Sequence, residues 1–140
     1  MEFITVEQFQ EQPVEVQKVF LDWWRVNRTD ADLVLLKTGR DKFKLQIINN
    51  IDMVCVENDE ITPLFTEGQL RKFIEDKSNG IVKLIQWHIE DSQISKRGYA
   101  IDILRKNEYH VTYHYKDLGE DLLKAYWKVA CSVAKEEVDG

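Results

Sequence analysis

The sequence predicts one α+β domain over residues 1–140, in which antiparallel sheets are packed by helices. Two observations predict this class. Helical spacing of apolar residues gives way to strand-like alternation and returns, in the order helix, three strands, helix, three strands, helix. No Pro- or Ser-rich linker separates the halves, and a chain of 140 residues suits one core.

The first helical region is predicted to run from a capping box at Thr5 to residue 26, with Pro13 in the first turn of a continuing or second helix. Its apolar stripe ends in the adjacent Trp23 and Trp24. Neighbouring helical positions diverge by about 100°, so one indole must leave the centre of the stripe. That indole is either a buried boundary residue or part of an exposed interface.

Three short strands are expected next, at 33–37, 43–48 and 51–55, because apolar residues alternate there. Turn-forming residues at 38–41 and 49–50 separate these strands, which predicts hairpins. A short apolar strand such as 33–37 at a sheet edge would allow a homodimer through edge pairing, with helix packing as the other route.

A second capping box at Thr66 predicts a short helix that stops at 78–80. The strands predicted after it are 81–89, 99–104 and 109–116, and the last has the cleanest period of two in the chain. In the first of these, Ile85, Trp87 and Ile89 are expected to point to one side of the strand.

The final helix is predicted from an Asp117 N-cap to about Glu137. Tyr113 belongs to a row of strand tyrosines, with Trp87 and Tyr99 expected on neighbouring strands. Such a face either packs on the final helix or forms a surface that stacks a base or anchors a protein partner. The sequence leaves both alternatives open.

Charge and the chain start bear on partners and location. Lys and Arg number 19 against 25 Asp and Glu, for a net charge of −6, which argues against general nucleic-acid binding. The beginning of the chain lacks a secretion signal, and no apolar run approaches the roughly 20 residues of a membrane span. We therefore expect a cytoplasmic protein without membrane contact, with Cys55 and Cys131 as structural thiols.

Chemistry-bearing motifs are absent from the sequence: it contains no GxSxG, phosphate-binding GxxxxGK[ST], GxGxxG or HExxH. His110 and His114 would lie roughly 13 Å apart on one strand, which is too far to share an ion, and His88 could add one ligand at most. Acidic pairs at strand ends are typical of solvated turns. We expect no catalytic residues, no metal and no cofactor.

Two segments carry a resemblance: residues 63–77, PLFTEGQLRKFIEDK, and residues 122–130, LLKAYWKVA. They resemble a family of small, uncharacterised proteins of clostridial phages and prophages, and the likeness includes residues 19–24. Family members follow the paired tryptophans with a proline and a Gly-Asp step, where this chain has residues 25–28, RVNR. The resemblance implies a phage-type source and carries no activity or functional residues.

These observations lead to one functional hypothesis and one alternative. The first is a non-enzymatic, phage-type accessory protein that binds a host protein, as an inhibitor of an antiviral defence system such as a CRISPR nuclease. An acidic surface would then occupy a nucleic-acid channel by charge complementarity. The alternative is a module that binds or sequesters a nucleotide-like small ligand. The residues expected to contact the partner are Trp24, Glu57, Asp59, Glu60, Trp87 and Tyr113.

Overall fold

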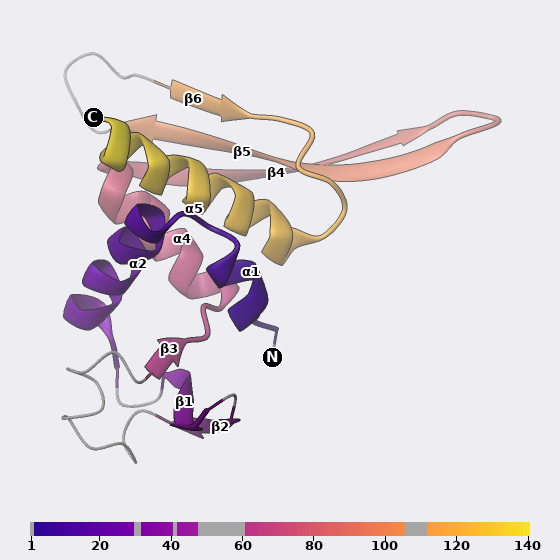
Figure 1. Ribbon diagram of the computed structural model, residues 1–140. Coiled ribbons are helices and arrows are strands. Elements are labelled where there is room, and N and C mark those ends of the chain that lie inside the picture. Colours follow the sequence, from indigo (N-terminus) through magenta and orange to yellow (C-terminus); the bar gives the residue numbers. More distant parts are fainter. Residues whose placement is uncertain (1, 30–31, 41, 48–60, 106–111) are drawn as a thin grey trace. The chain divides into compact units, whose positions relative to one another are not determined.

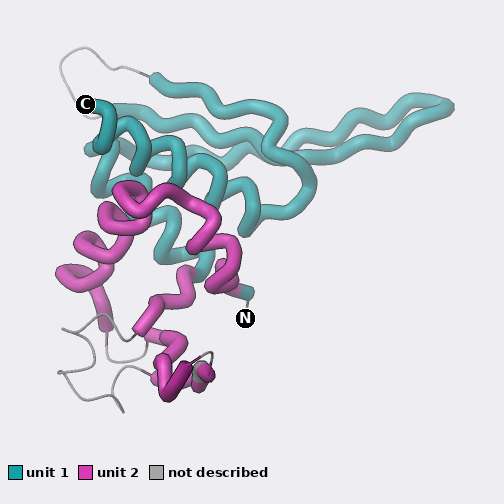
Figure 2. The backbone as a smooth tube through the Cα atoms, viewed as in Figure 1, with its two compact units in different colours: residues 1–2, 66–140 teal, residues 3–65 magenta. Residues whose placement is uncertain are grey.

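The computed structural model describes residues 2–29, 32–40, 42–47, 61–105 and 112–140. Within them the predicted α+β class is confirmed, because helices and two antiparallel three-stranded sheets follow one another in the expected order. The chain divides into two compact units (Figure 2), one of residues 3–65 and one of residues 66–140 with the first two residues. Each unit is described by itself, and the single domain over 1–140 stays a prediction.

The helices of the first unit are α1 (Val6–Gln10) and α2 (Val14–Asn27). The predicted capping box at Thr5 is confirmed: its hydroxyl accepts the backbone N–H of Gln8 at 3.2 Å, and the Gln8 side chain accepts the Thr5 N–H at 3.0 Å. Two helices form instead of one because Pro13 has no N–H to continue the hydrogen-bond ladder of α1.

Three phenyl rings form the centre of this unit. Phe9, Phe20 and Phe65 have ring centroids 5.5 to 6.3 Å apart, and each ring is at most 3% exposed. The backbone N–H of Ile4 donates to the carbonyl of Phe65 at 2.8 Å, which ties the start of the unit to its end. Such aromatic pairs contribute about 0.5–1.5 kcal/mol each beyond their buried area.

The first sheet has the strand order β2-β1-β3, built from β1 (Leu33–Gly39), β2 (Lys42–Ile47) and β3 (Ile61–Pro63). Strand β1 pairs antiparallel with both neighbours. The expectation that residues 33–37 offer a free edge is therefore wrong, because both sides of β1 are hydrogen-bonded. The strand predicted at 51–55 lies outside the described residues.

The second unit contains α4 (Glu67–Ser78), β4 (Gly80–Glu90), β5 (Ser95–Arg105), β6 (Thr112–Tyr115) and α5 (Leu122–Asp139). Its sheet has the order β4-β5-β6 and is antiparallel throughout. Helix α5 lies across one face of this sheet, and α4 packs beside α5 and against β4 (Figure 1).

Both ends of α4 form as the sequence predicts. The Thr66 N–H donates to the Gln69 side chain at 2.9 Å, and the Thr66 hydroxyl accepts the Gln69 N–H at 3.4 Å. Asn79 ends the helix with φ 52°, in the left-handed region that asparagine tolerates. Gly80 follows directly, and a Cβ there would lie 2.8 Å from the carbonyl oxygen of Leu104. Only glycine therefore lets β4 begin so close to β5.

The predicted N-cap of the last helix is wrong. Asp121 caps α5 by accepting the Lys124 N–H at 2.9 Å, whereas Asp117 has φ 56° and lies outside the helix. The physical reason is a competing backbone contact, since the Leu118 N–H donates to the Tyr99 carbonyl at 3.3 Å. This pairing holds the segment before α5 against the edge of β5 and delays the start of the helix.

Candidate protein-interaction surface

The register of the second sheet decides which side chains face the helices. Val82, Ile103 and Tyr113 are paired directly across the three strands, so they share one face. Val82 and Ile103 are only 2% and 1% exposed. Tyr115, two residues further along β6, hydrogen-bonds to Glu136 of α5. Burial is the main cause that raises the pKa of Tyr115, and the negative charge of Glu136 is the next. Of the two alternatives that the sequence left open for the tyrosine face, the contact between Tyr115 and Glu136 favours packing against the final helix.

The opposite face of the sheet points away from α5. We call it the outer face and define it by the side chains of alternate residues on the three strands. Its members are Ile81, Lys83, Ile85, Trp87, Ile89, Lys96, Gly98, Ala100, Asp102, Leu104, Thr112 and His114.

Exposed apolar side chains are concentrated on the hairpin formed by β4 and β5. Of the ten large hydrophobic residues that the described chain exposes, five lie on β4, β5 or the turn between them. Ile81, Ile89 and Leu104 belong to the outer face, with exposed fractions of 46%, 58% and 42%. Polar faces are the norm where one side of an antiparallel sheet meets water, so this composition indicates a binding surface.

Trp87 is fixed on the outer face by a glycine of the neighbouring strand. It pairs directly with Gly98, where an added Cβ would lie 2.6 Å from the indole ring. The indole therefore packs on bare backbone and stays half-buried. A preordered, partly exposed tryptophan is the type of residue that dominates binding energy in protein interfaces.

A polar row crosses the outer face between its apolar parts. Lys83, Asp102 and His114 are paired across the three strands. The His114 Nδ1 lies 2.8 Å from the Asp102 Oδ1, with the imidazole exposed and the carboxylate largely covered. The outer face thus offers a hydrogen-bonded pair and a lysine beside its isoleucines.

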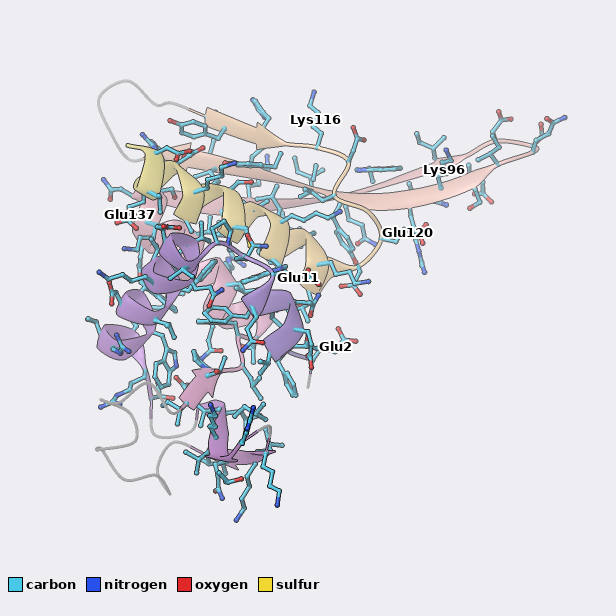
Figure 3. The ribbon with its side chains drawn as sticks, viewed as in Figure 1. Glu2, Glu11, Lys96, Lys116, Glu120 and Glu137 are labelled. Carbon is cyan, nitrogen blue, oxygen red and sulfur yellow. The ribbon has the colours of Figure 1, made fainter. Side chains whose placement is uncertain are left out.

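The hairpin extends beyond the rest of its own sheet. Strand β6 pairs only with residues 101–104 of β5, whereas β4 and β5 pair continuously to Glu90 and Ser95. The outer part is therefore a two-stranded ribbon, and it projects past α5 and β6 in Figure 1. Lys96 marks this projecting part in Figure 3.

Of the residues predicted to bind a partner, Trp87 and Tyr113 are not brought together. Trp87 lies on the outer face, whereas Tyr113 faces the helices with the Arg105 guanidinium 4.6 Å from its ring centroid. The expectation that Trp87 shares the tyrosine face is wrong, because its pairing with Gly98 gives it the opposite parity. Tyr99 does share that face.

The remaining predicted contacts offer no described surface. Trp24 is 2% exposed, and its indole N–H donates to Asp32 at 3.0 Å, as expected for a buried boundary residue. It therefore presents almost no side-chain surface to a partner. Glu57, Asp59 and Glu60 belong to a segment that the structure does not describe.

Sequence reasoning placed Ile85, Trp87 and Ile89 on a common side of their strand, and this is confirmed. It missed that this side faces away from the helices, and it did not identify Gly98 as the residue against which the Trp87 indole packs. The signal for Gly98 was weak, since a glycine within a strand indicates only some close backbone approach.

The histidines do not converge. His88 pairs with Arg97 on the helix-facing side of the ribbon, whereas His114 lies on the outer face. His110 lies in an undescribed segment. The described part of the chain contains no group of three or more His, Cys, Asp or Glu side chains arranged to hold a metal.

Cys131 sits on α5, and burial raises the pKa of its thiol to about 12. A thiol in this state is a poor nucleophile, because the thiolate is the reactive form. This environment is the one expected of a structural thiol, while Cys55 is not described.

Two cavities in the second unit bear on the small-ligand alternative. One of about 140 Å³ is lined by Gln86, Arg97, Gly98, Tyr99 and Glu120, the last labelled in Figure 3. The other, of about 390 Å³, is lined by Glu2, Thr66, Glu67, Gly68 and Leu123. The larger cavity carries two carboxylates and no cation, which disfavours a phosphate there. The smaller has an arginine and a tyrosine but falls below the roughly 300 Å³ of typical ligand sites.

Comparison of the chain with protein-family models, with curated proteins and with solved structures finds no match. No helix among the described residues is both long and apolar enough to cross a membrane.

Proposed function

We propose that this protein is a phage-type accessory protein that binds a host protein through the outer face of the β4–β5 hairpin. The observation that carries the proposal is Trp87 seated on Gly98 beside the exposed Ile89. An ordered indole with isoleucines around it loses little conformational freedom on binding, so more of its burial energy is retained as affinity.

The chemistry of the face indicates what kind of protein fits it. Its charged side chains are Lys83, Lys96 and Asp102, so cations outnumber carboxylates although the whole chain carries −6. We therefore propose a partner surface with an apolar centre and acidic residues at its rim. This differs from the channel-filling acidic surface expected from the sequence, whose residues 57, 59 and 60 the structure does not describe.

The class of partner rests on the resemblance of residues 63–77 and 122–130 to clostridial phage proteins. We propose that the partner belongs to a host antiviral defence system, such as a CRISPR nuclease, and that the protein inhibits it without catalysing a reaction. A target of that kind acts inside the cell, so the proposal includes a cytoplasmic location.

Photo-crosslinking in the host tests this proposal. A photoreactive amino acid replaces Ile85 on the outer face, and we expect one predominant adduct with a protein other than a second copy of this chain. Ile89→Ser in the same background should reduce that adduct at least tenfold. Val26→Ser is the matched control, since Val26 is 85% exposed on α2 and its loss should leave the adduct unchanged.

Two results would contradict the proposal. One is the absence of a partner adduct from the Ile85 position while the protein is folded by circular dichroism. The other is an equal loss of adduct in the Ile89→Ser and Val26→Ser variants, which would make the outer face no more important than any exposed apolar residue.

The alternative function, a nucleotide-binding module, is supported by one observation. Arg97 and Tyr99 line the same cavity, as a phosphate contact and a stacking ring would. Its volume of about 140 Å³ favours the protein-binding proposal. A nucleotide released on denaturing protein purified from its host would reverse that ranking, and Arg97→Ala should then abolish the retention.

A further inference from the structure

Strand β4 has an outer edge along which the described residues place no further strand. The sheet order is β4-β5-β6, so only one side of β4 is paired. Edge strands are usually protected by lysines, prolines or bulges. Residues 84–89, LIQWHI, contain none of these and no carboxylate.

Among the described residues, side chains of helix α4 hydrogen-bond this edge at Val82. The Val82 N–H donates to the Glu75 carboxylate at 3.0 Å, and the Val82 carbonyl accepts from the Arg71 guanidinium at 3.3 Å. The Arg71 Nε lies 3.7 Å from the Glu75 Oε1, and we call this pair of side chains the α4 clamp. Both backbone groups of Val82 therefore point away from β5.

In a strand, the N–H and C=O groups of every second residue point to the same side. The N–H and C=O groups of Leu84, Gln86 and His88 consequently point outward as those of Val82 do. In the part of the chain that the structure describes, no side chain or backbone group bonds them as Arg71 and Glu75 bond Val82. The clamp thus stops where an open row of donors and acceptors begins.

We propose that this open row pairs with the same row of a second copy, forming an antiparallel dimer through β4. One register matches the side chains of the outer face, and it centres on Trp87. On the helix-facing side it sets Leu84 against Glu90, at the two ends of the paired segment. Trp87 then faces Trp87 of the other copy, Ile85 faces Ile89, and Lys83 faces Asp91. Opposed aromatic, aliphatic and oppositely charged pairs each stabilise antiparallel strands.

Neighbouring registers fit less well. Centring on Gln86 or on Ile85 requires the outward groups of Val82, which Arg71 and Glu75 already hold. Centring on His88 sets Ile85 against Asp91 within the outer face and pairs the outward groups of residues 86–90 alone, which gives about six inter-strand hydrogen bonds. The Trp87 register uses the outward groups of residues 84–90 and forms about eight inter-strand hydrogen bonds.

The proposed pairing would stabilise the projecting part of the hairpin. Tyr99 of β5 exchanges backbone hydrogen bonds with Leu118 and Gly119. Beyond Tyr99 towards the turn, β4 is the only described strand that pairs with β5, and isolated two-stranded ribbons are marginally stable in water. Pairing two ribbons would create a four-stranded sheet there and join the two outer faces. The inference goes beyond the proposed partner binding, because backbone hydrogen bonds of the β4 edge form the dimer and the outer-face side chains set its register.

Sedimentation equilibrium of the full chain tests the dimer. We expect a mass twice 16.6 kDa for the native protein. Gln86→Pro removes an outward N–H without breaking a bond to β5, and should weaken dimerisation at least tenfold. Gln86→Ala keeps that N–H and is the matched control, which should dimerise as the native chain does. Circular dichroism establishes that each variant is folded.

Disulfide trapping tests the register. On a Cys55→Ser, Cys131→Ala background, an equimolar mixture of I85C and I89C should form a disulfide-linked dimer. Residues directly opposed in a non-hydrogen-bonded pair have Cα atoms about 4.5 Å apart, within disulfide range. Either variant alone should not cross-link, because its own cysteines would be four residues out of alignment.

The outcomes are decisive in each direction. A monomer at every concentration would overturn the inference, as would a dimer that persists in Gln86→Pro while the mixture stays unlinked. Partner crosslinking from the outer face is scored separately in the Gln86→Pro variant, where the outer-face side chains are retained. Failure of the dimer is therefore distinguishable from failure of the proposed function.

Discussion

The two halves of the β4–β5 hairpin share one continuous antiparallel register and yet occupy different environments. At the base, Val82, Ile101 and Ile103 are at most 2% exposed beneath α5 and beside β6. In the projecting half, His88 and Arg97 of the same helix-facing side are exposed, and Ile89 of the outer face is 58% exposed. The difference teaches that strand alternation specifies which residues share a face, while neighbouring elements decide whether that face is core or surface.

The sharpest test of this comparison removes one isoleucine from each half. Ile103→Ala at the base should lower the free energy of unfolding by about 2–5 kcal/mol, because it leaves a cavity in a filled core. Ile89→Ala in the projecting half should change it by less than about 0.5 kcal/mol. Urea denaturation measures both, and equal losses would contradict the division.

Gly80 at the base and Gly98 in the projecting half allow the same comparison through backbone packing. An alanine at Gly80 would place its Cβ 2.8 Å from the Leu104 carbonyl oxygen, whereas one at Gly98 would meet the Trp87 indole. Backbone cannot move aside as readily as a side chain. Gly80→Ala should therefore cost about 1–3 kcal/mol and Gly98→Ala about 1 kcal/mol or less. Thermal unfolding ranks them, and tryptophan fluorescence should change more in Gly98→Ala.

Alkaline pH should lower the free energy of unfolding through the buried thiol of Cys131. Burial raises the pKa of Cys131 on α5 from 9.0 to about 12, so the folded state holds its proton where the unfolded chain releases it. The stabilisation is complete below pH 9 and is lost as pH rises towards 12, by less than about 1.4 kcal/mol per pH unit. Unfolding followed at several pH values should give a shallower loss for Cys131→Ala than for the native chain.

The hydrogen bond from Val82 to Glu75 of α4 gives a further test at the base of the hairpin. Glu75→Ala leaves the Val82 N–H without its 3.0 Å partner, at a cost of about 0.5–1.5 kcal/mol. Lys72→Ala, an exposed position on the same helix, is the control and should be nearly neutral. A loss of stability that is equal in the two variants would show that Glu75 acts through the helix and not through the strand edge.

Local signals in the sequence predicted much of the fold because they act within a few residues. Thr5 and Thr66 cap their helices with the expected glutamine partners, and Asn79 ends α4. The prediction failed at Asp117, whose spacing also fits a cap. There a long-range bond between Leu118 and Tyr99 competes with the helix, and such contacts leave no mark in local spacing.

The candidate site was predicted only in part. The sequence indicated that Ile85, Trp87 and Ile89 share a side, but it could not tell that α5 covers the other side. For the same reason it grouped Trp87 with Tyr113, because parity between strands depends on a register that no single strand contains.

By itself, the sequence determined the α+β class, the capping boxes at Thr5 and Thr66 and the alternation within β2, β4, β5 and β6, whereas it did not predict β3 at Ile61–Pro63. These follow from side-chain periodicity and local hydrogen bonds, which are properties of short segments. Only the tertiary structure decided that β1 is central, that β4 has a strand on one side alone among the described residues, and that Trp87 rests on Gly98 facing outward. Those features depend on which strands pair and in what register, and this is settled by residues distant in the chain.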